Sequence, residues 1–167
     1  MTMFRTGVLA FAALAALMGP AAARDLSLEA FFKGRTEAKG TFSAITGVKR
    51  SFDVTLTGRS KGKTFTLIED FRYSDGERDR KTWRFTRTGP NTYRGTREDV
   101  VGETTVRIKG PVANFTYLVD LDPGPKTNIV RFYDKLVLAD DGRTIANTAT
   151  VWKYILPVAR VRVDFTR

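Results

Sequence analysis

The chain has 167 residues and a formal charge of +10, because 28 lysines and arginines outnumber 18 acids. It contains neither histidine nor cysteine. The lack of histidine excludes a Ser-His-Asp triad, an HExxH zinc site and a Cys-His dyad. The lack of cysteine excludes a disulfide framework, a thiol nucleophile and a lipid anchor on cysteine. Apolar residues make up 42% of the chain, which is enough to build a core.

Residues 1–23 have the three parts of a secretory signal peptide. Arg5 supplies a base, residues 7–18 form an apolar run, and three alanines end the segment before Arg24. The apolar run is shorter than the ~20 residues that a membrane-spanning helix needs. We therefore expect cleavage after Ala23, with an uncleaved N-terminal anchor as the alternative. Residues 24–167 are then a single domain, and an exported chain without disulfides predicts a soluble periplasmic protein.

One short helix is predicted at the start of the mature chain, over Ser27–Lys33. Ser27 is a favourable N-cap residue, and Gly34 is a favourable residue just beyond the end of a helix. The apolar residues of this segment are Leu28, Phe31 and Phe32. We expect their side chains to pack against the rest of the domain.

The rest of the mature chain alternates between apolar and polar residues. The apolar positions of the clearest runs are Phe52, Val54 and Leu56; Phe65, Leu67, Phe71 and Tyr73; Phe115, Tyr117, Val119 and Leu121; Val130, Phe132, Leu136 and Leu138; and Ala159, Val161, Val163 and Phe165. Successive side chains of a β-strand point to opposite faces, so each run has one face for a core and one for water.

Turn residues separate these runs at short intervals. The predicted turns are Ser74-Asp75-Gly76, Gly89-Pro90-Asn91, Asp122-Pro123-Gly124-Pro125 and Asp140-Asp141-Gly142. The pattern indicates about nine or ten strands joined by sequential hairpins. We predict an all-β fold, an antiparallel up-and-down, lipocalin-like β-barrel, with a β-sandwich as the alternative.

Four polar residues share the parity of apolar neighbours and are therefore expected to point inward: Glu69, Asp134, Asn147 and Lys153. Buried charges must be paired or hydrogen-bonded. One interpretation is an internal structural network, for example a pair between Glu69 and Lys153. The second is a cavity whose polar groups orient a ligand. The third is a strand bulge that turns these side chains outward.

Further candidates come from the aromatic and acidic positions around this face. Tyr73 and Trp83 lie on either side of the charged segment 74–80, Asp99 begins a turn-like segment, and Tyr117 lies in an alternating run. The candidate ligand-binding residues are thus Glu69, Tyr73, Trp83, Asp99, Tyr117, Asp134, Asn147 and Lys153. No motif for a metal or a cofactor is present, and we expect neither.

The basic surplus is expected on the outer face of the strands. Positions of outward parity hold Arg107, Lys109, Arg131, Lys135, Arg160 and Arg162, and further bases lie near the first hairpins: Lys61, Lys63, Arg78, Arg80, Lys81, Arg84 and Arg87. A basic exported protein is attracted to anionic membrane surfaces. We expect no nucleic-acid partner, because no recognition motif appears. Solubility alone is the simpler account of the charge.

The segment from Glu69 to Glu77 resembles a bacterial envelope family known as domain of unknown function 3833. Its sequence is Glu69-Asp70-Phe71-Arg72-Tyr73-Ser74-Asp75-Gly76-Glu77, and Trp83, Gly95 and Asp99-Val100-Val101-Gly102 extend the similarity. Weaker similarity covers most of the mature chain, including Gly110, Tyr117, Asp134, Asn147 and Lys153. The resemblance implies an exported protein with a barrel-like β fold, and it implies no activity.

This chain departs from the family pattern in three places. It has no cysteine for the lipid anchor that many members carry, which implies a soluble form. Pro111-Val112 stands where the family tends to have Asn-Ala, and Lys135-Leu136 stands where it tends to have Trp-Met. The last change means that an aromatic lid of the family is not implied for this chain.

The function that these observations favour is binding of a lipid-like or apolar small molecule inside the barrel, at the cell envelope. Two alternatives are an enzyme and a scaffold. A carboxylate-based enzyme would use Glu69, Asp99 or Asp134 together with Lys153 or Tyr117. An envelope interaction protein would use the basic surface. The sequence favours a binding protein over an enzyme, and it predicts no oligomeric state.

Overall fold

The computed structural model describes residues 24–121, 124 and 127–167. The predicted signal peptide, residues 1–23, lies outside these described residues, as do Asp122, Pro123 and Pro125 of the predicted turn at 122–125 and their neighbour Lys126. Among the described residues, no helix is long and apolar enough to cross a bilayer.

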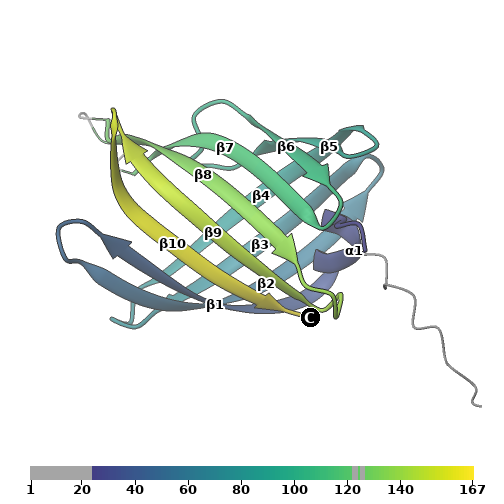
Figure 1. Ribbon diagram of the computed structural model, residues 1–167, viewed down its shortest axis with the longest axis horizontal. Helices are drawn as coiled ribbons and strands as arrows, with labels where there is room; N and C mark the ends of the chain where they lie inside the picture. Colours follow the sequence, from purple (N-terminus) through teal and green to yellow (C-terminus); the bar gives the residue numbers. More distant parts are fainter. Residues whose placement is uncertain (1–23, 122–123, 125–126) are drawn as a thin grey trace, which may run out of the picture.

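Ten antiparallel strands of the described chain form a closed barrel (Figure 1). The strands are β1 Gly34–Ala44, β2 Lys49–Lys61, β3 Thr64–Tyr73, β4 Arg78–Gly89, β5 Thr92–Thr96, β6 Thr104–Lys109, β7 Val112–Asp120, β8 Ile129–Leu138, β9 Thr144–Lys153 and β10 Leu156–Thr166. Each strand pairs with its neighbours in sequence, and β1 closes the barrel by pairing with β10, from Glu37 opposite Thr166 to Ala44 opposite Ala159. The predicted up-and-down, lipocalin-like barrel is confirmed, and the sandwich alternative is wrong because the sheet has no open edge.

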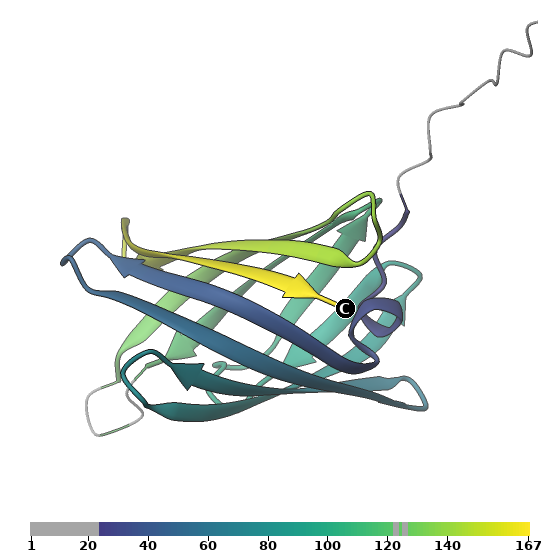
Figure 2. The same cartoon turned by 90° about the horizontal axis from the view of Figure 1, so that it is seen from below.

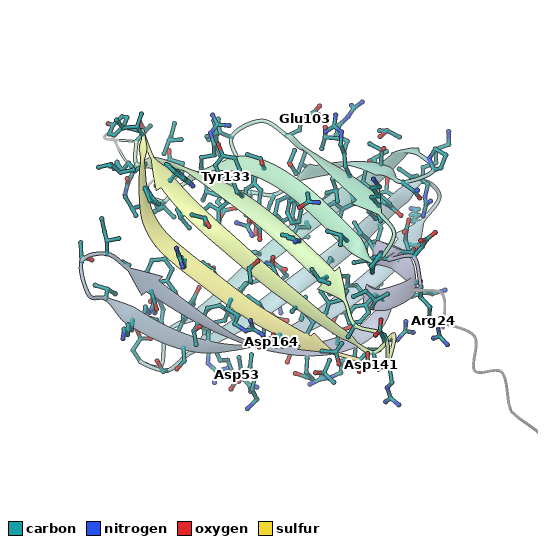
Figure 3. The ribbon with its side chains drawn as sticks, viewed as in Figure 1. Arg24, Asp53, Glu103, Tyr133, Asp141 and Asp164 are labelled. Carbon is teal, nitrogen blue, oxygen red and sulfur yellow. The ribbon has the colours of Figure 1, made fainter. Side chains whose placement is uncertain are left out.

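The alternation of the sequence determines which side chains fill the interior. Along β2, for example, Phe52, Val54 and Leu56 are buried, whereas the residues between them are exposed or half-buried. The outer face carries many charged side chains, among them Asp53, Glu103 and Asp164, which point away from the barrel (Figure 3). The expected division between an apolar interior and a polar exterior is therefore present.

The helix α1, Leu28–Phe32, lies across one end of the barrel (Figure 2). It begins as predicted, because the Ser27 side chain accepts a hydrogen bond from the Ala30 amide at 3.3 Å. Leu28, Phe31 and Phe32 are buried, and the ring of Phe32 packs edge-on against that of Phe165 at 5.3 Å. The helix thus closes this end of the barrel with apolar side chains.

A glycine on β2 lets α1 approach the wall closely. A β-carbon at Gly58 would collide with the backbone carbonyl of Phe32 and lie 2.7 Å from the Phe65 ring. Lys33, the residue after the helix, forms an isolated bridge with Gly58. Only glycine leaves room for this contact.

Glu29 of α1 is also held by two side chains of the wall. Its Oε2 atom accepts hydrogen bonds from the Tyr93 hydroxyl at 2.5 Å and from Arg87 Nη2 at 2.9 Å. Burial alone would raise the pKa of Glu29, but these hydrogen bonds and a backbone one outweigh it and lower the pKa. The helix is therefore attached by an ionic contact as well as by apolar packing.

The strands β5 and β6 are short, and the segment between them completes the wall beside β4 and β7. β4 pairs with β5 only from Arg84 onward. Beyond that point, the Thr82 amide of β4 donates to both carboxylate oxygens of Glu98, at 2.9 and 3.0 Å. On the other side, Val101 donates to the Leu118 carbonyl of β7 at 2.9 Å. This arrangement places the residues around position 98 against the barrel interior.

Candidate functional site

The barrel encloses a cavity of about 890 Å³ that reaches from α1 to the opposite rim. Leu28 and Phe32 line it at the closed end, and Arg50 and Glu77 line it at the rim, which we call the mouth. The apolar lining includes Phe52, Val54, Leu67, Phe71, Phe85, Val106, Phe115, Val119, Phe132, Leu136, Ala149, Val161 and Val163. A volume of this order accommodates a small organic molecule.

Aromatic rings form a continuous group in the middle of the cavity wall. The indole of Trp83 stacks on Phe85 at 5.2 Å and meets the Tyr117 ring edge-on, also at 5.2 Å. Tyr117 in turn stacks between Phe115 at 5.5 Å and Phe132 at 5.3 Å. The wall therefore offers flat, rigid apolar surface to a ligand.

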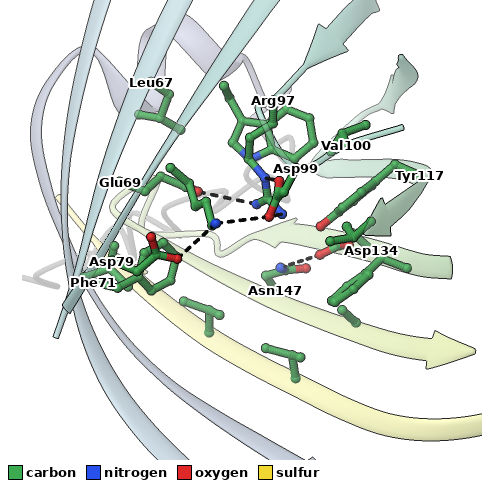
Figure 4. Close-up of a pocket in the computed structure, with 18 of the residues that line it drawn as sticks. Leu67, Glu69, Phe71, Asp79, Arg97, Asp99, Val100, Tyr117, Asp134 and Asn147 are labelled. Atoms are coloured by element: carbon green, nitrogen blue, oxygen red, sulfur yellow. Dashed lines mark hydrogen bonds and ion pairs between the residues drawn. The ribbon is translucent and has the colours of Figure 1, made fainter. Parts of the chain in front are cut away.

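Arg97 is the centre of the polar part of the cavity (Figure 4). Its Nε atom lies 2.6 Å from Asp99 Oδ1, and its Nη1 atom lies 3.7 Å from Glu69 Oε2. The guanidinium also lies over the Trp83 ring, 4.7 Å from its centroid. The buried cation is thus balanced by two carboxylates and an aromatic face.

Lys81 of β4 extends this group of charges toward the mouth. Its Nζ atom lies 3.1 Å from Asp79 and 3.4 Å from Asp99. Lys81 has the same strand parity as the buried Trp83, and its side chain lines the cavity.

A second polar group lies across the cavity, on β8 and β9. The Asn147 amide donates to Asp134 Oδ1 at 2.7 Å. The remaining oxygens of the pair, Asp134 Oδ2 and Asn147 Oδ1, are buried and have no partner with normal hydrogen-bond geometry among the described residues. The Tyr117 hydroxyl points toward the same carboxyl group (Figure 4). The pair is therefore a buried polar group in the cavity wall.

Burial raises the pKa values of both interior acids. The pKa of Glu69 rises to about 7, because burial and the nearby acids outweigh the attraction of Arg97. The pKa of Asp134 rises to about 6, because burial outweighs the hydrogen bonds and the charge of Arg97. Burial, together with the charge of Asp134, also raises the pKa of the Tyr117 phenol. Near neutral pH, Glu69 is therefore divided between its charged and neutral forms.

The mouth carries its own charged contact. Arg50 Nη2 lies 2.7 Å from Asp75 and 2.6 Å from Glu77, and its guanidinium lies 4.0 Å from the centroid of the Tyr73 ring. The ring of Tyr73 stacks 6.0 Å from that of Phe71. The rim on this side is thus an ion-paired turn next to an aromatic wall.

Seven of the eight residues predicted from the sequence line the same cavity: Glu69, Tyr73, Trp83, Asp99, Tyr117, Asp134 and Asn147. Lys153 does not line it, and the expected pair between Glu69 and Lys153 is wrong. Lys153 is the last residue of β9, where its amine donates to Asn128 Oδ1. Parity assigns a face of the strand but not a height along the barrel.

The partner of Glu69 is instead Arg97, which is not among the residues predicted from the sequence. A signal was present, because Tyr93 and Gly95 point inward on β5 and Arg97 continues their parity. It lies one residue beyond the strand, where alternation no longer constrains direction. Arg50 and Asp79 were missed in the same way at the strand ends near the mouth.

A family model described as "Protein of unknown function (DUF3833)" matches residues 9–167. No curated protein matches the chain. The fold is similar to that of Rv2717c from M. tuberculosis, with a TM-score of 0.60 and 13% identity over 89% of this chain and 98% of that one.

A second similar structure is the S-type phycobiliprotein lyase CPES from Guillardia theta. It has a TM-score of 0.56 and 8% identity, and the match covers 84% of this chain and 91% of that one. At such low identity, the two similarities show a shared barrel fold alone.

Proposed function

We propose that this chain, which belongs to the DUF3833 family, binds a lipid-like, largely apolar small molecule inside its barrel, in the cell envelope. The observation that carries the proposal is the cavity of about 890 Å³, with aromatic and aliphatic walls and a few convergent polar groups. A ligand that covers these walls is removed from water, and burial contributes about 25 cal/mol per Å² of apolar surface.

The polar groups favour a ligand that carries one hydrogen-bond donor. Asp134 and Asn147 line the cavity, and Asn147 Oδ1 is a buried acceptor without a hydrogen-bond partner among the described residues. A buried acceptor without a hydrogen bond costs about 1–3 kcal/mol. A hydroxyl or amide N–H group on the ligand would remove this cost, so we propose an apolar body with such a group near Asp134.

The N-terminal sequence supports a place of action in the cell envelope. The base, apolar run and terminal alanines of residues 1–23 support export through a cleaved signal peptide. An envelope location brings the protein near lipids, which are the most abundant apolar molecules there. We therefore propose that the ligand is taken from this environment.

The test is titration of the purified protein with a fluorescent long-chain alcohol. Ala149 is buried on β9 and lines the cavity, whereas its neighbour Thr148 is exposed on the outer face. Ala149→Phe fills part of the cavity and should weaken binding by about tenfold or more, whereas Thr148→Phe adds the same side chain outside and should bind normally. Circular dichroism and the melting temperature establish that both variants fold.

The donor preference is measured in the same titration by competition. An unlabelled long-chain alcohol should displace the probe about tenfold better than its methyl ether of equal length, because the ether cannot donate a hydrogen bond. Equal competition by the two would refute the proposed donor. Normal binding by a folded Ala149→Phe variant would refute the cavity as the binding site.

A further inference from the structure

Large apolar side chains are exposed on two turns at the mouth of the barrel. Ile45 and Val48 lie in the turn between β1 and β2, and Tyr154, Ile155 and Leu156 lie at the turn between β9 and β10. Tyr154 is 93% exposed and Ile155 is 85% exposed. We call these five residues the apolar tips.

The two turns belong to neighbouring strands. β1 pairs with β10, and the Ile45 amide donates to the Val158 carbonyl at 2.9 Å. Both turns lie at the end of the barrel opposite α1, on the left in Figures 1 and 2. Phe42 of β1 and Val161 of β10, in the same two strands, line the cavity. The apolar tips therefore stand beside the entrance to the cavity.

The opposite end of the barrel lacks this feature. Its turns are residues 62–63, 89–91, 110–111 and 139–143, and none of these described residues is an exposed large apolar side chain. Single exposed apolar residues are ordinary on a protein surface. A group of five at one end, next to the cavity mouth, marks an interaction surface instead.

The backbone at Tyr154 supports this reading. Tyr154 has a φ of 55°, and no other described residue except glycine has a positive φ. It is the first residue of a two-residue turn, a position where glycine is favoured when φ is positive. A large aromatic side chain therefore occupies a strained position while it makes almost no contact with the rest of the chain.

We propose that the apolar tips insert into an anionic phospholipid bilayer and place the mouth of the cavity on the membrane surface. Lys49 directly follows Val48, and Lys153 directly precedes Tyr154, so each turn combines apolar and basic side chains. The chain as a whole has a formal charge of +10, which favours anionic headgroups. Tyrosine and lysine are typical of the membrane interface.

Two acidic residues at the same end are held by a basic residue of the protein. Asp75 and Glu77, in the turn between β3 and β4, are both ion-paired with Arg50. Their charge is thus partly compensated within the protein. The inference extends the proposed function, because it states where the lipid-like ligand enters.

The experiment is co-sedimentation of the protein cleaved after Ala23 with vesicles that contain either zwitterionic lipid alone or a mixture with anionic phosphatidylglycerol. The test variant is the double substitution Tyr154→Gly with Ile155→Ser, in which glycine relieves the positive φ. The control is Tyr133→Ser, which removes an exposed tyrosine from the outer wall of β8. We expect the wild type and the control to bind anionic vesicles, and the double variant to bind about tenfold or more weakly.

Equal vesicle binding by the double variant and the wild type would overturn the proposal, as would a wild type that binds no vesicles. A concentration-dependent increase in mass that the double variant loses would assign the tips to a second copy of the chain instead. The proposed ligand site is measured separately by the alcohol titration. A double variant that binds the alcohol normally but not the vesicles separates the docking surface from the cavity.

Discussion

Glu69 is an interior residue whose charge depends on its surroundings. It lies inside the wall with Arg97 as its cationic neighbour at 3.7 Å, and burial raises its pKa to about 7. A carboxyl group with a raised pKa in the native state binds its proton more tightly there than in the unfolded chain. The native state is therefore favoured by protonation, and stability falls as the pH rises from about 4.5 to about 7. Asp134, with a pKa of about 6, acts in the same direction.

The prediction concerns Glu69→Gln, which keeps the shape of the side chain and removes its titration. The variant should show a flatter decline of the free energy of unfolding between pH 4.5 and pH 7 than the wild type. Over this range, the free energy of unfolding of the wild type should fall by roughly 1–3 kcal/mol more than that of the variant, since one pKa unit corresponds to about 1.4 kcal/mol. Urea denaturation at a series of pH values measures it. Parallel curves for the two proteins would show that Glu69 has an ordinary pKa.

Strand parity predicted the direction of the interior side chains but not their partners. Glu69, Asp134 and Asn147 point inward as their alternation required. The partner of Glu69 is determined by how far each strand is shifted along its neighbours, and a single sequence does not contain that shift. Lys153 therefore lies on a strand, as predicted, but near the mouth, whereas Arg97 comes from a segment beyond the end of β5.

At the scale of elements, α1 could be predicted from its caps and its apolar residues, because local chemistry decides where a short helix begins and ends. The strands could be predicted from their alternation, and the closure of the sheet from the need to cover so many apolar faces. The place of α1 across one end could not be predicted. It depends on Gly58, whose missing side chain leaves room for the backbone of Phe32.

This contact leads to a prediction for Gly58→Ala. The added methyl group collides with the Phe32 carbonyl, so α1 must shift away from the wall. We expect a loss of about 2–4 kcal/mol in the free energy of unfolding. Gly89→Ala is the matched control, because a β-carbon there meets its nearest neighbour, Thr92, at 3.7 Å. The control should change stability by less than about 1 kcal/mol. Hydrogen exchange of the Phe31 and Phe32 amides would report the release of α1, and equal effects of the two substitutions would contradict it.

At the scale of the whole molecule, the barrel depends on the pairing of its first and last strands. β1 pairs with β10 from Glu37 opposite Thr166 to Ala44 opposite Ala159. Without β10, both β1 and β9 would present unpaired edges. The closure therefore joins segments that lie far apart in the sequence, and such contacts slow folding.

A chain that ends before Leu156 should fail to form a closed barrel. We expect it to aggregate or to unfold without a cooperative transition, because the edges of β1 and β9 are left unpaired. A synthetic peptide with the sequence of residues 156–167 should restore a cooperative transition when it is added in excess, by completing the sheet. Size-exclusion chromatography and thermal unfolding measure both effects. A truncated chain that stays monomeric and melts cooperatively on its own would contradict the role given to this pairing.

The helix across one end of the barrel makes the cavity a blind pocket. A molecule that enters at the mouth must leave by the same route, and the part that entered last leaves first. No molecule passes through the protein from one end to the other. Such a shape suits a carrier that loads and unloads at one face and keeps its cargo in a fixed orientation. It does not suit a conduit.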